Sequence, residues 1–264
     1  MSVVVCFSTI PSRIDRCLPM VQSLLRQTYS PQGIFLFLPE EYARENQSYS
    51  IPSWIEDNGI KVRHVEKDYG PATKLIPALE MDLDPDTMII TVDDDIIYEA
   101  HLIEELVKVA EAVPDSAVGF LGIGSGYVHG EYIPESHIPV PFCLGGYRGI
   151  CYRRKFFDYD LLMSQYERFC GDGICVVDDQ LFCAHVKKRG YGLAVAKTNH
   201  PRRYNRDEHT MQGFPYDLDI NGEILGLNFV SLNLGNGVNE PENVASSMKE
   251  LKRFDDLLAS GALD

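Results

Sequence analysis

The chain has 264 residues, of which 45% are hydrophobic, and it carries a formal net charge of −15 at pH 7. This size and composition are typical of a globular protein that can bury a sizeable core. The negative charge disfavours nucleic acid and anionic membrane surfaces as partners, since both are bound through basic patches. We therefore expect no nucleic-acid partner.

Two further features of the sequence concern location. No stretch approaches the roughly 18 apolar residues needed to span a bilayer, and the first residues lack the features of a signal peptide. The seven cysteines are odd in number and show no CxxC pairing, which predicts free thiols rather than disulfides or a zinc site. We expect a cytoplasmic protein without a membrane span.

Strands and helices alternate in the first half of the chain. A continuous apolar, β-rich run predicts a buried strand over residues 3–9, and apolar residues at helical spacing predict a helix over 15–27. The other elements predicted here are strands over residues 33–38, 60–65 and 87–92 and helices over 74–83 and 100–112.

The pattern is looser after residue 112. Many Gly, Pro and Tyr residues predict a loop-rich insertion over 116–142, with one strand at 117–123. Strand-forming residues mixed with glycines occupy 142–152. The remaining predicted elements are a helix over 178–188, a strand over 191–197 and a charged helix over 242–258.

This alternation predicts an α/β fold with a mixed, mainly parallel sheet flanked by helices. In such sheets ligands bind beyond the carboxyl ends of the strands. Three chemically distinctive segments follow predicted strand ends, namely residues 9–13, 68–74 and 93–95. We therefore expect these three segments to converge on one edge of the sheet.

Three consecutive aspartates, Asp93, Asp94 and Asp95, end the predicted strand at 87–92. Burying such charges without partners would cost several kcal/mol each, so a cation is expected beside them. A divalent metal that accompanies a phosphate is one candidate, because Mg²⁺ and Mn²⁺ prefer hard oxygen ligands. The alternative is a solvated loop whose acids cap the following helix.

Five segments in this order resemble a GT-A glycosyltransferase. They are Thr9-Ile10-Pro11-Ser12-Arg13, Asp68-Tyr69-Gly70-Pro71-Ala72-Thr73-Lys74, Asp93-Asp94-Asp95, Gly145-Gly146-Tyr147 and Asp178-Asp179-Gln180. Their order and spacing are similar to the inverting, family-2-like group, including the small glycosyltransferase domains of chlorella viruses, over roughly residues 1–200.

The resemblance implies a GT-A (Rossmann-like) fold and a metal-dependent hexosyltransferase. Such an enzyme moves a sugar, with inversion, from a UDP-sugar donor to a hydroxyl of a glycan or other acceptor. We expect one domain over residues 1–203, with a nucleotide-binding half (1–98) and an acceptor and catalytic half (99–203). A C-terminal extension, residues 204–264, is expected to pack on the same domain.

The resemblance also implies roles for the acids. Asp95 would ligate the metal, Mn²⁺ or Mg²⁺, and Asp93 would face the ribose or share the metal. Asp94 lies on the opposite side of an extended backbone, so its role at the nucleotide is less defined. A further metal ligand is expected at His200, for which a structural histidine is the alternative.

Nucleotide binding is implied for Thr9, Pro11 and Arg13, which follow the first strand. Arg13 offers planar, multidentate donors to a base or a phosphate. The alternative is that Pro11 and Ser12 open the helix, with Ser12 as its N-cap. Both interpretations can hold together.

Asp68 and Lys74 are also implied to contact the donor. Lys74 would place a positive charge at the diphosphate, and Asp68 would accept a hydrogen bond from the uracil or the ribose. The alternatives are a solvated surface lysine and an aspartate that forms the turn before Tyr-Gly-Pro.

An inverting transfer needs one carboxylate to remove the proton of the acceptor hydroxyl. By similarity, Asp179 is the expected base and Asp178 the second choice, and the alternative is an acidic pair that caps the next helix. Gly145 and Gly146 would allow the sugar or acceptor to approach the backbone closely. Tyr147 would stack on a sugar face.

Three other functions fit parts of the pattern. A haloacid-dehalogenase-type phosphatase carries its DxD on the first strand, with Thr or Val two positions later, where this chain has Ile97. A sugar nucleotidyltransferase has a Gly- and Arg-rich loop after the first strand, and residues 9–13 lack the glycines. An inactive sugar-nucleotide-binding module would leave the retention of Asp95 and Asp179 unexplained.

Overall fold

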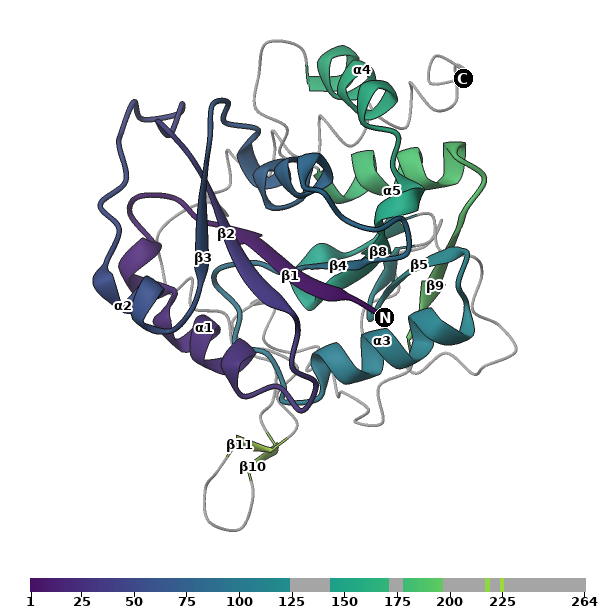
Figure 1. The fold of residues 1–264 in the computed structure, drawn as a ribbon, viewed down its shortest axis with the longest axis horizontal. Coiled ribbons are helices and arrows are strands. Elements are labelled where there is room, and N and C mark those ends of the chain that lie inside the picture. Colours follow the sequence, from purple (N-terminus) through teal and green to yellow (C-terminus); the bar gives the residue numbers. More distant parts are fainter. Residues whose placement is uncertain (124–142, 171–177, 197–216, 219–223, 226–264) are drawn as a thin grey trace, which may run out of the picture.

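The computed structural model describes residues 1–123, 143–170, 178–196, 217–218 and 224–225. Within these residues, a seven-stranded sheet with the order β3-β2-β1-β4-β8-β5-β9 forms the centre of the fold (Figure 1). Its strands are β1 (Val3–Ser8), β2 (Gly33–Pro39), β3 (Lys61–Val65), β4 (Met88–Thr91), β5 (Ser116–Gly119), β8 (Ile150–Arg153) and β9 (Gly192–Val195).

The sheet is mixed and mainly parallel, as predicted. β1 pairs in parallel with β2 and β4, β2 with β3, and β5 with β9. Only β8 runs antiparallel to its neighbours in this sheet, β4 and β5. Two further two-stranded ladders join β6 (Gly122–Ile123) to β7 (Cys143–Leu144) and β10 (Asp217–Leu218) to β11 (Ile224–Leu225).

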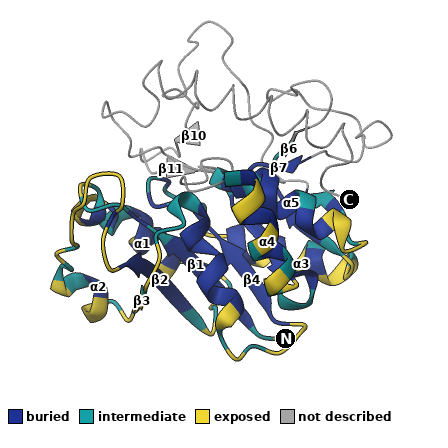
Figure 2. Cartoon of the chain, turned by 90° about the horizontal axis from the view of Figure 1, so that it is seen from above, coloured by how far each residue is buried: buried dark blue, intermediate teal, exposed yellow. Residues whose placement is uncertain are grey.

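Helical elements cover both faces of the sheet, so the central strands are buried on both sides, whereas the edge strand β3 is largely exposed. In β1, Val3, Val5 and Phe7 face one core cluster, and Val4 and Cys6 face the other. The first cluster is completed by α1 (Leu18–Leu25), α2 (Ser53–Asp57) and α3 (Leu102–Ala112). The second is completed by the 3₁₀ segments η2 (Gly70–Lys74), η3 (Ile76–Glu80) and η6 (Arg154–Phe156) and by α4 (Tyr159–Cys170) and α5 (Asp178–Lys188). Figure 2 shows the buried strands enclosed between helices whose outer sides are exposed.

Two predicted helices are interrupted, each at a proline. The helix expected over 74–83 is wrong, because η2 and η3 occupy this region and Pro77, which has no N–H to donate, stands at the start of η3. The helix expected over 15–27 is a short 3₁₀ segment, η1 (Ile14–Arg16), followed by α1, with Pro19 in its first turn.

The second half of the chain differs more from expectation. The strand expected over 117–123 is split between β5 and β6, which lie in different sheets, and the helices α2 and α4 were not predicted. The helix expected over 178–188 coincides with α5. The helix expected over 242–258 lies outside the described residues, as does most of the extension at 204–264.

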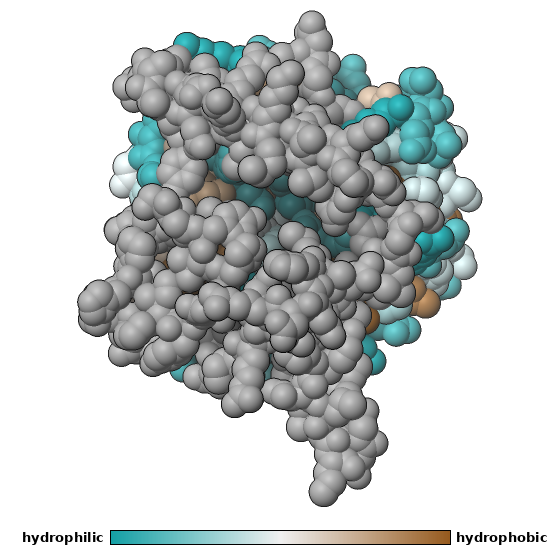
Figure 3. Space-filling model, turned by 180° about the vertical axis from the view of Figure 1, so that it is seen from behind, coloured by the Kyte–Doolittle hydropathy of each residue, from teal (hydrophilic) through white to brown (hydrophobic). Residues whose placement is uncertain are grey.

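The described surface is mainly hydrophilic. Of the large hydrophobic side chains in the described residues, only Met1 and Leu25 are exposed, and the view from behind shows mostly hydrophilic residues around the periphery (Figure 3). None of the helices in this part of the chain is long and apolar enough to cross a membrane. The six cysteines that lie in it are free thiols.

One fully buried histidine lies on α5. The Nε2 atom of His185 accepts the backbone N–H of Asp158 at 3.2 Å, so Nδ1 carries the proton and donates it to Gln165 Oε1 at 2.6 Å. The ring stacks on Phe157 with 5.4 Å between the centroids. Burial, together with the charge of Arg189, lowers the pKa of His185 to about 4.

We expect protonation of His185 to destabilise the fold as the pH falls from about 6.5 to about 4. Because the folded-state pKa lies below the unfolded value, the stability is present above the unfolded value and lost on acidification, by ~3 kcal/mol. Urea unfolding between pH 4 and 7 should show a shallower pH dependence for His185→Gln than for the wild type. The control His64→Gln, at an exposed position, should keep the wild-type slope, and an unchanged slope in His185→Gln would contradict the prediction.

Candidate active site

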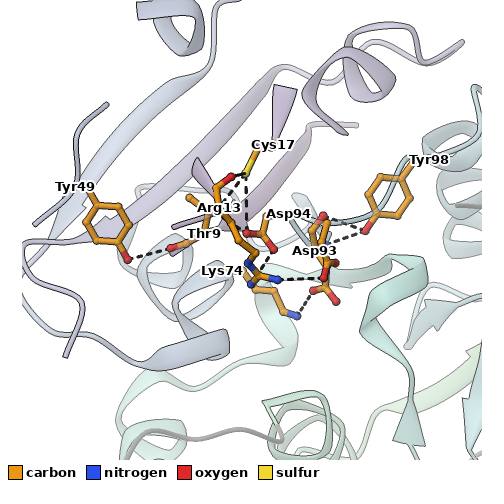
Figure 4. A network of polar contacts seen from close by, with 9 residues as sticks. Thr9, Arg13, Cys17, Tyr49, Lys74, Asp93, Asp94 and Tyr98 are labelled. Atoms are coloured by element: carbon orange, nitrogen blue, oxygen red, sulfur yellow. Dashed lines mark hydrogen bonds and ion pairs between the residues drawn. The ribbon is translucent and has the colours of Figure 1, made fainter. Parts of the chain in front are cut away.

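Polar side chains meet beyond the carboxyl ends of β1 and β4, at the edge predicted from the sequence (Figure 4). β1 and β4 pair in parallel with Cys6 opposite Thr91, so the segments that follow the two strands begin close to each other. Residues 9–13 and 93–95 therefore contact each other, and Lys74 of η2 reaches the same place. The convergence of the three segments is confirmed.

Asp94 anchors the acid loop, which we define as residues 93–95. Asp94 is only 5% exposed. Its carboxylate accepts a hydrogen bond from Thr9 Oγ1 at 2.5 Å and pairs with Arg13 Nη2 at 3.1 Å. Burial raises the pKa of Asp94, while Arg13 and Thr9 oppose that rise. The residue with the least defined role in the sequence thus joins the acid loop to the end of β1.

Arg13 neutralises two of the three acids. A turn that contains Pro11 sets its position, with the Arg13 N–H donating to Ile10 O at 3.0 Å. Its guanidinium also pairs with Asp95 Oδ2 through Nη1 at 3.1 Å. Ser12 does not cap the following segment, whose N-cap is Arg13 itself without a side-chain cap bond, so that alternative is wrong. The nucleotide contacts of Thr9, Pro11 and Arg13 stay a prediction.

Lys74 lies buried among carboxylates and is not a surface lysine, so the solvated alternative is wrong. Lys74 is 5% exposed. Its Nζ atom lies 2.7 Å from Asp93 Oδ1, 3.0 Å from Asp178 Oδ2 and 4.0 Å from Asp179 Oδ1. Burial alone would lower the pKa of Lys74, but Asp178, Asp93 and Asp179 raise it well above its usual value. One ammonium group therefore joins the acid loop to the acidic pair of α5.

The acidic pair occupies the first turn of α5, where the helix dipole favours negative charge. Asp179 Oδ2 accepts the backbone N–H of Gly146 at 2.6 Å, while Oδ1 has no hydrogen-bond partner among the described residues. Burial and the charge of Asp178 raise the pKa of Asp179 to about 7. A side chain at position 146 would collide with this carboxylate, which explains the glycine.

Tyr98, for which the sequence predicted no role, links the acid loop to the loop at 145–149. Its buried hydroxyl accepts the backbone N–H of Asp93 at 2.8 Å and donates to Tyr147 O at 3.2 Å. Burial raises the pKa of Tyr98 well above its usual value, so the hydroxyl stays protonated. An apolar run that ends in tyrosine is compatible with many environments, so no sequence signal singles this residue out.

Other parts of the site have structural contacts of their own. Tyr49 donates to Thr9 O at 3.0 Å and was also missed from the sequence. Gly145 leaves room for the Leu121 side chain, and the Tyr147 ring packs against the first core cluster. The stacking of a sugar on Tyr147 and the approach of a ligand to Gly145 and Gly146 stay predictions.

Asp68 forms a turn, as the alternative for this residue proposed. Its Oδ1 accepts the N–H of Gly70 at 2.7 Å and its Oδ2 accepts the N–H of Ala43 at 3.0 Å. A contact with uracil or ribose stays a prediction. His200, the third expected metal ligand, lies outside the described residues.

The acid loop carries more negative charge than its cations balance. Burial and the neighbouring charges of Asp93 and Asp94 raise the pKa of Asp95 to about 7. The described residues hold no group of three His, Cys, Asp or Glu side chains that would bind a metal by themselves. Because Mg²⁺ is commonly bound by one or two carboxylates together with substrate phosphates, Asp93 and Asp95 suit a divalent cation that is shared with a phosphorylated ligand.

No protein-family model and no curated protein matches the chain. Among solved structures, it is similar to S. aureus TarS at 15% identity with a TM-score of 0.45, over 75% of this chain and 36% of that one. TarS 1-349 matches at 16% identity with a TM-score of 0.47, over 75% and 59%, and its complex with UDP-GlcNAc at 15% with a TM-score of 0.43, over 76% and 60%.

The chain thus spans between 36% and 60% of the length of the TarS chains. Identities and TM-scores this low do not establish a shared family or activity. The likeness to chlorella-virus domains stays a prediction from the sequence.

We expect Lys74→Met to destabilise the protein by ~3–5 kcal/mol, because it leaves Asp93, Asp178 and Asp179 without their shared cation. The free energy of unfolding at pH 7.5 measures this loss. Lys155→Met is the matched control, since Lys155 also pairs with carboxylates, but its partners Asp86 and Asp115 are exposed. It should cost less than ~1 kcal/mol, and equal losses in the two variants would refute the special role of Lys74.

Proposed function

We propose that the protein is a metal-dependent, inverting glycosyltransferase of the GT-A type. It moves a sugar from a UDP-sugar to a hydroxyl of a glycan or other acceptor. The α/β sheet and the ordered segments that resemble this family support the proposal. The location of the candidate site, beyond the carboxyl ends of parallel strands, is where such a sheet binds ligands.

One observation carries the proposal: Lys74 Nζ lies within 4.0 Å of both Asp93 and Asp179. A transferase needs a place for a leaving diphosphate and, next to it, a base for the incoming hydroxyl. The acid loop supplies the first and Asp179 the second, and a single ammonium group spaces them. A binding module has no need of the second carboxylate.

Asp179 has the properties of a general base. A base is most effective when its pKa lies near the working pH, and burial raises the pKa of Asp179 to about 7. The Gly146 N–H fixes one oxygen, which leaves Oδ1 to take a proton. The acceptor oxygen bonds to the anomeric carbon as the bond from that carbon to the diphosphate oxygen breaks. The hydroxyl proton passes to Asp179, and UDP leaves with the electron pair.

Asp95 and Asp93 would hold the divalent cation, with His200 as a further candidate ligand. When bound, the cation supplies positive charge where the departing diphosphate develops negative charge. Arg13 keeps the acid loop in place through Asp94 and Asp95. UDP and UDP-GlcNAc are the first ligands to try, because structures of TarS with each have been determined.

The phosphatase alternative fits less well. It requires the acidic pair of its DxD on the first strand, whereas β1 ends at Ser8 and the acids follow β4. The nucleotidyltransferase alternative still lacks its glycine-rich loop, since a turn that contains Pro11 follows β1.

Asp95→Ala should weaken the Mn²⁺-dependent binding of UDP at least tenfold, which is ~1.4 kcal/mol. The reason is that it removes one of the two carboxylates assigned to the cation. Calorimetric titration with UDP, in Mn²⁺ and then in EDTA, measures the effect. Asp57→Ala, at an exposed position of α2, should bind as the wild type does. If the wild type bound UDP with the same affinity in Mn²⁺ and in EDTA, the metal role of the acid loop would be disproved.

Asp179→Asn should bind UDP normally but lose sugar transfer by roughly 10²–10⁴-fold, the usual contribution of a general base. The wild-type kcat should rise with pH through about 7, as Asp179 ionises. The control Asp160→Asn, an exposed acid in the first turn of α4, should keep both activity and pH profile.

The same variant separates a catalytic from a structural role. A carboxyl whose folded-state pKa is raised stabilises the fold only while it is protonated, and that stability is lost as the pH rises through about 7. Asp179→Asn should therefore melt no lower than the wild type at pH 8. Transfer at the wild-type rate would show that the base is another group.

A further inference from the structure

The contacts around the candidate site close into a ring. Asp93 Oδ1 contacts Lys74 Nζ at 2.7 Å, and Lys74 Nζ contacts Asp178 Oδ2 at 3.0 Å. Asp179, the next residue of α5, accepts the Gly146 N–H at 2.6 Å. The chain continues into Tyr147, whose carbonyl accepts the Tyr98 hydroxyl proton at 3.2 Å, and the same hydroxyl accepts the Asp93 N–H at 2.8 Å.

Two bridges therefore hold the acid loop against the base. Lys74 forms one through charge, which acts over distance and tolerates small displacements. The Tyr98 hydroxyl forms the other through two hydrogen bonds, which weaken steeply when distance or angle changes. The hydroxyl bridge is therefore more sensitive to small displacements than the Lys74 bridge.

Tyr98 is itself held rigidly. Tyr98 is 3% exposed, and its backbone N–H donates a hydrogen bond to Ser23 Oγ of α1 at 3.0 Å. Removal of the hydroxyl would leave the Asp93 N–H and the Tyr147 carbonyl without this partner, and it would change neither the ring packing nor any charge.

We propose that the Tyr98 hydroxyl is a positioning group that couples the acid loop to the loop carrying Gly146, and so sets the distance between the bound donor and the base Asp179. The inference rests on the proposed glycosyltransferase function. Tyr98 touches neither reacting atom, and its effect on transfer passes through Asp93 and Tyr147. A loss of about 1 Å in the alignment of reacting groups can cost roughly 100-fold in rate.

The test compares Tyr98→Phe with Tyr152→Phe and the wild type. Tyr152 is also a fully buried tyrosine, but its hydroxyl has no hydrogen-bond partner among the described residues. UDP release from UDP-GlcNAc or UDP-glucose, in Mn²⁺ and with a panel of monosaccharide acceptors, gives kcat and the KM for the donor. Hydrogen exchange reports on the amides of residues 93–95 and 145–148.

For Tyr98→Phe we expect a fall in kcat of roughly 10- to 100-fold, with the donor KM and the Kd of UDP changed less than about threefold. Exchange should become faster in both loops together. Tyr152→Phe should change none of these quantities. A merely structural role would lower the melting temperature but would leave kcat per folded molecule intact.

Two outcomes would overturn the inference. One is an unchanged kcat in Tyr98→Phe, and the other is faster exchange confined to residues 93–95. A wild type that neither binds UDP nor releases it from any donor refutes the proposed function instead. In that case the exchange data alone decide whether the hydroxyl couples the loops.

Discussion

The site depends on one buried ammonium group among carboxylates. Lys74 stands between the acid loop and the first turn of α5, which approach it from different parts of the chain. Without this cation, Asp93 and the acidic pair of α5 would lose their shared partner, and an uncompensated buried charge costs several kcal/mol. Lys74 therefore stabilises Asp93 together with the acids of α5, while Arg13 pairs with Asp94 and Asp95.

The sheet fixes how closely these groups can be placed. β1 and β4 are buried on both faces and paired in register, so Thr9 and the acid loop leave the sheet side by side. The contacts of Asp94 with Thr9 and Arg13 then hold the acid loop next to the end of β1. Asp93 and Asp95, on either side of it, each form an ion pair, with Lys74 and Arg13, so the positions proposed for the ligand are set at the strand ends rather than on long loops.

Much of this arrangement could be predicted from the sequence, for identifiable reasons. β1, β2 and β4 are continuous apolar runs, because they are buried on both faces, and three adjacent carboxylates at a strand end demand a cation. The burial of Lys74 could not be predicted, since lysines are mostly exposed. The role of Tyr98 could not be predicted either, since it depends on which backbone groups tertiary packing brings to a hydroxyl. The direction of β8 could not be predicted either, because a strand buried on both faces has the same apolar sequence pattern whether it runs parallel or antiparallel to its neighbours.

The reversal of β8 has a consequence for the site. β5 ends at Gly119 and β8 starts at Ile150, and these two residues are paired in the sheet. β5 therefore ends, and β8 begins, at the edge of the sheet where β4 delivers the acid loop. Antiparallel neighbours such as β5 and β8 need no crossover helix between them. Because β8 begins at this edge, Gly146 and Tyr147, which directly precede it, reach Asp179 and Tyr98.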